Sequence, residues 1–430
     1  MQGRSGHTPK FRVKIGGKEL EAGVVRHISV DRAIDMADMF VVDVRNDGCK
    51  ISDDPAVEPG NRVEIELGYE EGGGRTTRVM VGRVVALRGH FPRSGPMGLR
   101  IQGYATNHLL TQGRKTRGFK GPVTYSEIVQ RVIAADYAGK LVADVEDSGI
   151  RHEYVFQRNQ TDLEFFLELA SRIGFELSVR FHADDPNAPP QLRFRRPEPA
   201  ATPTRKLKKG ENLLSFNPRT RTALTATGVT VQSWDPLEAR PIRATADKND
   251  VTADMDGAEL GPQVSERITA AVEQVHEVPM RTEQELQAFA RGRMVEEALE
   301  FVTAEAVATG NPDLLPGLVV ELEGVGDIFS GQYYVHRVIH DLHDGGFNTR
   351  LGLRRTSIIK KQEPVQQPGQ GAGQQQPGQA GQGAGPQQPT PPPEPPAQIP
   401  PPPVPPGGPG VALPPTVPGL PGKRGKLGGG

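Results

Sequence analysis

The sequence predicts an α+β protein that is mainly β, with two tube-like antiparallel β-barrel modules, an inserted α/β unit and a disordered C-terminal tail rich in Pro, Gln and Gly. Three observations predict this organisation. A strand pattern recurs in order, helix-start signals lie between its two copies, and the composition changes abruptly near residue 361. We expect the first β module in residues 1–120, the α/β unit in 121–210, the second β module with one helix in 211–358, and the tail in 359–430.

Both copies of the repeat begin with the same turn and strand. Residues 59–66 read PGNRVEIE and residues 316–323 read PGLVVELE, so a Pro-Gly turn precedes a strand with carboxylates on one face and aliphatic side chains on the other. Two further matches follow in order: VGRVV at 81–85 with VHRVI at 335–339, and LRI at 99–101 with TRL at 349–351. Glycine-rich segments between the first two matches suit hairpin turns. Each copy is therefore predicted to be a small antiparallel barrel or sandwich.

Helix starts are marked by capping boxes, in which a Thr hydroxyl and a Glu three residues later satisfy amide donors of the first turn. The pairs are Thr124 with Glu127, Thr161 with Glu164, and Thr282 with Glu285. Apolar residues follow each box at helical spacing. The second helix is bracketed by strand-like runs, and Gly174 stands where a left-handed C-terminal cap belongs. The first two helices predict the α/β unit, and the third is the helix of the second β module.

The tail has too little apolar area to offset the entropy of ordering it, so we expect flexible coil with local polyproline II. A solvated linker is the simpler interpretation. A docking strip for a partner with an aromatic groove is the alternative.

Bulk composition excludes several classes of function. The 51 Lys and Arg residues against 52 Asp and Glu give a formal net charge of -1, which does not favour nucleic acid or an anionic membrane as a partner. A single cysteine, Cys49, excludes an intrachain disulfide and a Cys-based zinc cluster, and it fits folding in a reducing cytoplasm. The apolar runs are far shorter than the ~20 residues that cross a bilayer. We expect neither stable membrane insertion nor a secretory signal peptide.

The strongest candidate for an enzymatic site is the histidine cluster of His336, His340 and His343, because clustered imidazoles with Asp341 and Asp344 could hold a metal. The run is rich in Tyr, Val and Ile and matches a strand of the repeat. In a strand, His336 and His340 would lie on one face but ~13 Å apart. We therefore expect structural or interface histidines, no catalytic residue, no cofactor and no metal. A metal-dependent hydrolase is the alternative.

Four glutamates alternate along the matched strands, namely Glu64, Glu66, Glu321 and Glu323. A polar barrel face is a simpler interpretation of this spacing than a pair of glycosidase carboxylates. Such a face could line a lumen or meet a neighbouring subunit. We take these glutamates, with His336 and His340, as candidate interface residues.

Two stretches resemble a known family. One runs from the strand at 153–157 through the Thr-Asp-capped helix at 161–165 to Gly174-Phe175, and the other runs from Pro316-Gly317 through 331–335 to Val338 and His340. They are similar to the phage late-control protein D family, which includes the hub portion of type VI secretion spikes and extracellular contractile injection systems. The likeness spans about residues 10–358.

The resemblance implies a non-enzymatic hub of a contractile machine. Three chains with duplicated modules would present six quasi-equivalent modules, so a homotrimer could adapt a hexameric inner tube to a trimeric spike. Other baseplate subunits are implied partners, and the spike tip is expected on a separate chain because only the tail follows Arg355. We expect assembly in the cytoplasm and then a place in a virion or contractile particle. The alternatives are a tail-tip metal-dependent cell-wall hydrolase, and an adaptor that binds cargo through the tail.

Overall fold

The computed structural model describes residues 8–71, 74–182, 185, 188–222, 226–235, 238–251, 259–268, 272–276, 280 and 282–358. They belong to one compact unit, Met1–Val365, and a second unit covers Gln366–Gly430. The predicted tail and part of the predicted glycine turn at 72–74 lie outside the described residues. No helix in the described ranges is long and apolar enough to cross a membrane.

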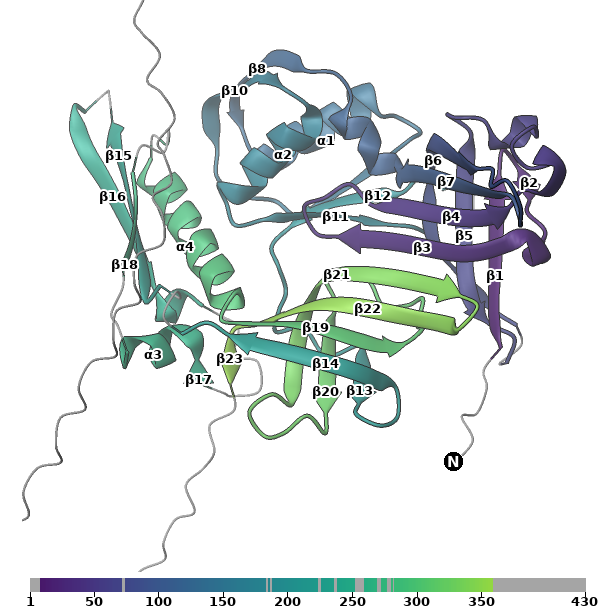
Figure 1. Ribbon diagram of the computed structural model, residues 1–430. Helices are drawn as coiled ribbons and strands as arrows, with labels where there is room; N and C mark the ends of the chain where they lie inside the picture. Colours follow the sequence, from purple (N-terminus) through teal and green to yellow (C-terminus); the bar gives the residue numbers. More distant parts are fainter. Residues whose placement is uncertain are drawn as a thin grey trace, which may run out of the picture. The chain divides into compact units, whose positions relative to one another are not determined.

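Within the described residues, a curled 13-stranded sheet, antiparallel except where β13 pairs with β20, runs through both predicted β modules (Figure 1). We call its two parts the N-terminal half and the C-terminal half. The N-terminal half contains β1 (Pro9–Ile15), β2 (Lys18–Glu19), β3 (Val25–Ala33), β4 (Met39–Arg45), β5 (Arg62–Tyr69), β6 (Thr76–His90) and β7 (Gly98–Ala105). The C-terminal half contains β13 (Arg205–Lys208), β14 (Leu213–Thr220), β19 (Val302–Thr309), β20 (Val319–Glu323), β21 (Gly331–His343) and β22 (Gly346–Arg355). The predicted mainly β fold is confirmed.

The two halves share strand order, and the register of β5 with β6 matches that of β20 with β21. The last strand differs, because β1 runs antiparallel to β5 whereas β13 runs parallel to β20. Their strands follow the paths β3-β4-β7-β6-β5-β1 and β14-β19-β22-β21-β20-β13. Val63 pairs with Gly82 as Val320 pairs with Tyr333. Both long strands, β6 and β21, carry a bulge at the same place in the ladder. The turns before β5 and β20 therefore begin two copies of one fold, as the repeat predicts.

The bulges correct the sequence alignment of the middle strand. That alignment equates Val85 with Ile339, whereas the bulged residues are Val85 and His336. When the two bulged residues are aligned, the counterpart of Val338 is Leu87. The sequence alignment had matched Val338 with Val84, three residues earlier. Beyond the bulge the slip was invisible in the sequence, because the three-residue shift crosses Val85. Val84, wrongly matched to Val338, faces a core as Val338 does.

The α/β unit follows the first half and contains β8 (Lys115–Val123), α1 (Tyr125–Asp136), β9 (Val142–Val145), β10 (His152–Gln160), α2 (Asp162–Ser171), β11 (Glu176–Arg180) and β12 (Gln191–Arg195). Both predicted capping boxes are present. Gly174 has a φ of 66°, as a left-handed cap requires. The helices pack with the strands around a separate hydrophobic core, in which Phe165 and Leu169 are buried more deeply than Leu163 of the same helix.

Between β14 and β19 the chain makes an excursion that the N-terminal half lacks. It contains β15 (Gly228–Asp235), β16 (Arg240–Asp247), β17 (Glu259–Leu260), α3 (Gly261–Glu266), β18 (Val272–Val275) and α4 (Glu283–Leu299), and β23 (Ser357–Ile358) pairs with β17. The third capping box starts α4, which packs on β15 and β16 through Leu286 and Met294. The short helix α3 is additional to the one helix predicted here. The predicted domain boundaries stay predictions.

Candidate assembly interface

A ladder between β21 and β3 joins the two halves edge to edge (Figure 1). Up to its bulge, β21 pairs with β20, and beyond the bulge it pairs with β3 from Arg337 opposite Ala33 to His343 opposite His27. One strand therefore belongs to the sheets of both halves. We call this contact the internal joint.

The outer face of the internal joint is polar. His27 Nε2 lies 2.6 Å from Asp341 Oδ1, and Arg337 donates to both oxygens of Asp31 at 2.9 and 2.5 Å. Burial acts to raise the pKa of Asp341, but hydrogen bonds from His27 and Arg350 lower it overall. Because these side chains are partly exposed, each pair contributes little free energy. Their positions favour this register of the ladder over a slipped one.

The inner face of the internal joint is apolar. Leu342 lies opposite Ile28, and both are buried in the core of the N-terminal half although Leu342 comes from the C-terminal half. Phe347, across the hairpin from Leu342, packs on Tyr69 with 5.8 Å between ring centroids. Burying each large apolar side chain stabilises the joint by about 1.5–3 kcal/mol. The tip of the β21–β22 hairpin is thus an apolar plug in the neighbouring half.

A buried ion pair fixes the β3–β4 turn to the α/β unit. Arg32, whose side chain is 2% exposed, donates to Asp38 Oδ2 at 3.1 Å and to the carbonyl oxygen of Val179 at 2.6 Å. Its guanidinium carbon lies 4.7 Å from the centroid of the Phe181 ring. The cation therefore links the β3–β4 turn, which supplies Asp38, to the α/β unit, which supplies the Val179 carbonyl and the Phe181 ring.

Two carboxyl groups line a cavity of about 720 Å³ where the α/β unit, α4 and β21 meet. The backbone N–H of Leu177 donates to Asp35 at 2.8 Å, and the Tyr334 hydroxyl donates to Glu176 Oε1 at 2.5 Å. Burial raises the pKa of Asp35 to about 6 and that of Glu176 to about 7. Both carboxyl groups therefore change charge near neutral pH. We expect the stability of the packing between the α/β unit and β21 to depend on pH in this range.

We expect Glu176→Gln to change how stability depends on pH. Because burial raises the pKa of Glu176 from 4.5 to about 7, its contribution to stability is fully present below pH 4.5 and is lost as the pH rises through 7. The wild type should therefore lose about 2–3 kcal/mol relative to the variant across this window. Urea unfolding of both proteins at several pH values measures this difference.

Wild type and variant must be compared because the contribution of His336 to stability changes with pH in the opposite direction to that of Glu176. Burial lowers the pKa of His336 to about 4, so its contribution is lost as the pH falls through that value. This histidine is common to both proteins and cancels from their difference. Parallel pH profiles for wild type and variant would contradict the prediction.

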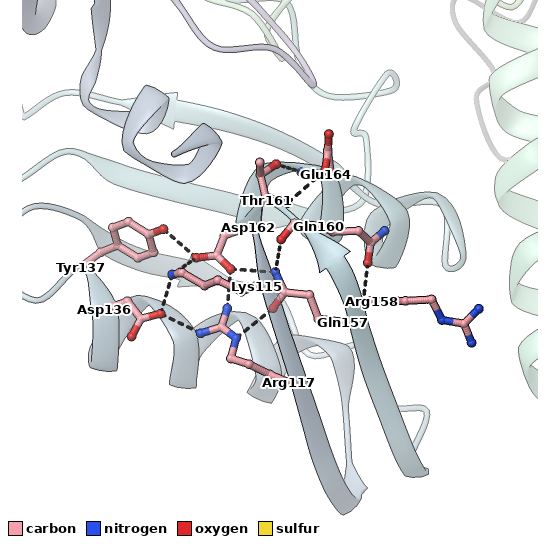
Figure 2. A network of polar contacts seen from close by, with 10 residues as sticks. All are labelled: Lys115, Arg117, Asp136, Tyr137, Gln157, Arg158, Gln160, Thr161, Asp162 and Glu164. Atoms are coloured by element: carbon pink, nitrogen blue, oxygen red, sulfur yellow. Dashed lines mark hydrogen bonds and ion pairs between the residues drawn. The ribbon is translucent and has the colours of Figure 1, made fainter. Parts of the chain in front are cut away.

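Asp162, the first residue of α2, is the centre of a polar network inside the α/β unit (Figure 2). Its carboxylate has no exposed area and accepts hydrogen bonds from Lys115 at 2.6 Å, from Arg117 and from the Tyr137 hydroxyl at 2.6 Å. Gln157 donates at 3.0 Å to Oδ1, the oxygen that also accepts from Arg117. Burial and the nearby carboxylate raise the pKa of Tyr137 to about 12. The network ties β8, β10 and both helices together, which gives the Thr-Asp motif a structural role.

The predicted glutamates lie in two equivalent pairs on β5 and β20. Glu64 contacts Arg62 at 2.9 Å, and Glu66 accepts from the Thr76 hydroxyl at 2.7 Å. The other pair, Glu321 and Glu323, shares Lys206 at 2.9 and 3.1 Å. All four have partners within the chain. Their role at a subunit interface stays a prediction.

The predicted histidines lie on β21, but His336 and His340 do not share a face as predicted, because the bulge at His336 turns its side chain to the side of Arg337 while His340 faces the core. His340 is fully buried, its Nδ1 lies 3.2 Å from Thr349 Oγ1, and burial lowers its pKa to about 3. His336 is the bulged residue. Among the described residues, no group of three or more His, Cys, Asp and Glu side chains could hold a metal. An interface role for these two histidines also stays a prediction.

Of the residues that form the internal joint, the sequence had singled out only His340, Asp341 and His343. Leu342, Ile28 and Arg32 were not among the candidates. The available signal was the in–out alternation of β3, which puts Arg32 on the same face as Ile28 and Val30.

Solved phage tail proteins have a similar fold. The 43 kDa tail protein of prophage MuSo2 from Shewanella oneidensis has a TM-score of 0.61 at 14% identity, covering 81% of this chain and 99% of that one. A tail protein from Neisseria meningitidis MC58 has a TM-score of 0.60 at 16% identity, covering 81% and 97%. The E. coli c3393 protein has a TM-score of 0.52 at 13% identity, covering 80% and 77%, and is described as a type VI secretion component similar to the T4 bacteriophage tail proteins gp27 and gp5. The predicted resemblance to tail hub proteins is confirmed at the level of the fold.

Sequence comparison adds the family. No curated protein matches the chain. A family model described as the Alg8 N-terminal domain matches residues 5–344, which include the whole N-terminal half, the whole α/β unit and every strand of the C-terminal half except β22. The chain therefore belongs to the Alg8 N-terminal domain family.

Proposed function

We propose that the protein is a non-catalytic structural hub of a phage-tail-like contractile machine. It forms a homotrimer that adapts a hexameric inner tube to a trimeric spike. The internal joint carries this proposal, because it places two modules of one fold side by side within one chain. Three chains arranged by the same lateral contact would present six such modules. The similarity to tail proteins and to a type VI secretion component supports the assignment.

The parts that are not duplicated would supply the three-fold features. The α/β unit and the excursion between β14 and β19 occur once per chain, so a trimer has three copies of each. The duplicated sheets suit a six-fold partner, and the single-copy units suit a three-fold one. This division gives a physical basis for matching two symmetries in one ring.

The proposed partners follow from this geometry. The duplicated sheets would stack on the inner tube, and the single-copy units would contact other baseplate subunits and a separate spike-tip protein. Assembly in the cytoplasm would precede a place in a virion or contractile particle. The proposal includes no catalysis, no nucleic acid and no stable membrane insertion.

The proposal is tested by measuring the mass of the full-length protein by native mass spectrometry, alone and co-expressed with its spike protein. Trimers are expected in at least the spike-bound sample, and electron microscopy of these particles should show a ring with six similar lobes. Monomers in both samples, at every protein concentration used, would overturn the proposal.

Deleting the residues after Lys361 is expected to leave the trimer intact. The duplicated sheets and the internal joint lie wholly before this position. Native mass spectrometry of the truncated and full-length proteins measures the subunit number. Loss of trimers on truncation would contradict this prediction and show that the tail is part of the assembly contact.

A further inference from the structure

We propose that a hollow on the outer face of the N-terminal half binds the carboxylates of an acidic polypeptide segment. The hollow has a volume of about 640 Å³ and is lined by residues of β3, β4, β7 and the end of β6, which are neighbours in the sheet (Figure 1). We call it the arginine hollow, after Arg26, Arg45, Arg88 and Arg100, which line it. The site lies within one chain, so this inference goes beyond the proposed function and does not depend on the number of subunits.

Two of these arginines face each other across a ladder. Arg88 on β6 lies directly opposite Arg100 on β7, and both side chains are exposed on the face that points away from the core. Like charges directly opposite each other destabilise an antiparallel pair of strands. Asp43, on the other side of Arg100, accepts two hydrogen bonds from it, at 2.7 and 2.9 Å. Among the described residues no carboxylate pairs with Arg88, so nothing in these ranges offsets the repulsion.

The C-terminal half shows that the fold does not need a cation at this place. When the two bulges are aligned, Arg88 corresponds to Ile339, and Arg100 corresponds to Arg350. Arg350 pairs with Asp341 at 2.6 Å, so one arginine meets one carboxylate there. The second arginine of the N-terminal half is therefore an addition to the common fold, and its cost to stability calls for a ligand that balances its charge.

The end of the hollow differs between the two halves in the same direction. Arg45 lies opposite Gly98, as Thr309 lies opposite Asn348 in the other copy. Arg45 contacts Asp47 at 3.0 Å, but both side chains are exposed, so this pair is weak. Gly98 adds no side chain to the floor of the hollow, and a Cβ there would meet no atom closer than 3.8 Å. The N-terminal copy therefore has both an additional cation and open space beside it.

The balance of charges in the arginine hollow favours an anion. Its lining contains four arginines and two aspartates, Asp43 and Asp344. Asp43 is engaged by Arg100, and Asp344 lies 3.8 Å from Arg26. The remaining arginines have no carboxylate of the lining to themselves. Because a guanidinium binds a carboxylate through two parallel hydrogen bonds, a side chain of Glu or Asp is a suitable partner for Arg88.

The surroundings of the hollow favour an acidic polypeptide over a nucleic acid. Nucleic acids bind along extended cationic tracks, because each neutralised phosphate adds to the affinity. Beyond the hollow, the arginines of this face at the internal joint are paired with Asp31 and Asp341, so the excess of positive charge is local. Pro96 and Met97 also line the hollow, and they suit the methylene groups of glutamate side chains. A short acidic segment matches both features.

Fluorescence anisotropy with a labelled oligoglutamate peptide measures binding to the full-length protein. The peptide should bind the wild type at low salt and dissociate as salt is added. Arg88→Ile introduces the residue of the C-terminal copy and should weaken binding by about tenfold or more, because a charge-assisted hydrogen bond is lost. Gly98→Leu should weaken binding by a similar factor with no change of charge, because the new side chain fills the floor of the hollow.

Thermal unfolding separates loss of the site from loss of the fold. Arg88→Ile removes a pair of like charges, so its Tm should equal or exceed that of the wild type. The matched control is Arg158→Ile, which replaces an exposed arginine of β10 in the α/β unit. This variant should leave binding of the peptide unchanged.

The outcomes decide between an acidic polypeptide and its rivals. Weaker binding in both Arg88→Ile and Gly98→Leu, with Arg158→Ile unchanged, supports the site. Absence of wild-type binding at low salt, or an equal loss in Arg158→Ile, would overturn it. The competing probe is a single-stranded oligonucleotide of the same net charge. Tighter binding of this probe than of the peptide, with the same response to the variants, would make the occupant a nucleic acid and the proposal wrong.

Discussion

Replacing Arg32 by methionine is expected to lower the free energy of unfolding by about 3–5 kcal/mol. The substitution leaves the carboxylate of Asp38, which is 3% exposed, without its cation. It also removes the hydrogen bond to the Val179 carbonyl that ties β3 to the α/β unit. Urea unfolding followed by circular dichroism measures the effect as a fall in the transition midpoint.

The matched control is Arg337→Met. Arg337 also forms an ion pair with an aspartate of β3, but its side chain is 46% exposed, so its loss should cost at most about 1 kcal/mol. Equal effects of the two substitutions would mean that burial does not determine the strength of these pairs.

Replacing Asp162 by alanine is expected to cost about 3 kcal/mol, the low end of the range for a broken buried ion pair. The carboxylate is fully buried, but Lys115 and Arg117 are 30% and 25% exposed and regain some water when it is lost. The expected lesion is local, because the network links β8, β10 and both helices within the α/β unit. Hydrogen exchange of the amides of α1 and α2 measures it.

Glu164→Ala is the control in the same first turn of α2. Its carboxylate completes the capping box from an exposed position, so its removal should weaken the helix start and leave the rest of the unit protected. Uniform loss of protection across both β halves in the Asp162 variant would contradict a local role for the network.

Local signals in the sequence were sufficient for much of this fold. Thr124, Thr161 and Thr282 each start a helix, because a capping box depends only on residues three apart. The Pro-Gly turns at 59 and 316 marked equivalent strands for the same reason. The bulges at Val85 and His336 left no comparable signal in the sequence. A bulge is defined by how one strand pairs with its neighbour, and that pairing joins residues far apart in the chain.

The candidate site was harder to predict because its residues are brought together by pairing between distant strands. His340 and Glu64 stood out as polar residues, yet one is enclosed in the internal joint and the other pairs with a neighbour on its own strand. Leu342 is an ordinary apolar residue in the sequence. Its importance follows only from its place at the tip of the β21–β22 hairpin, which enters the core of the N-terminal half.

The bulge in β21 has a mechanical consequence. Because the backbone continues unbroken from the ladder with β20 into the ladder with β3, a force that pulls the two halves apart acts on a covalent strand anchored at both ends. The main-chain hydrogen bonds of each ladder then share the load along their length, and none can yield far ahead of the others. In the proposed hub, recoil from a contracting sheath would be borne by the main chain, while side chains keep the strands aligned.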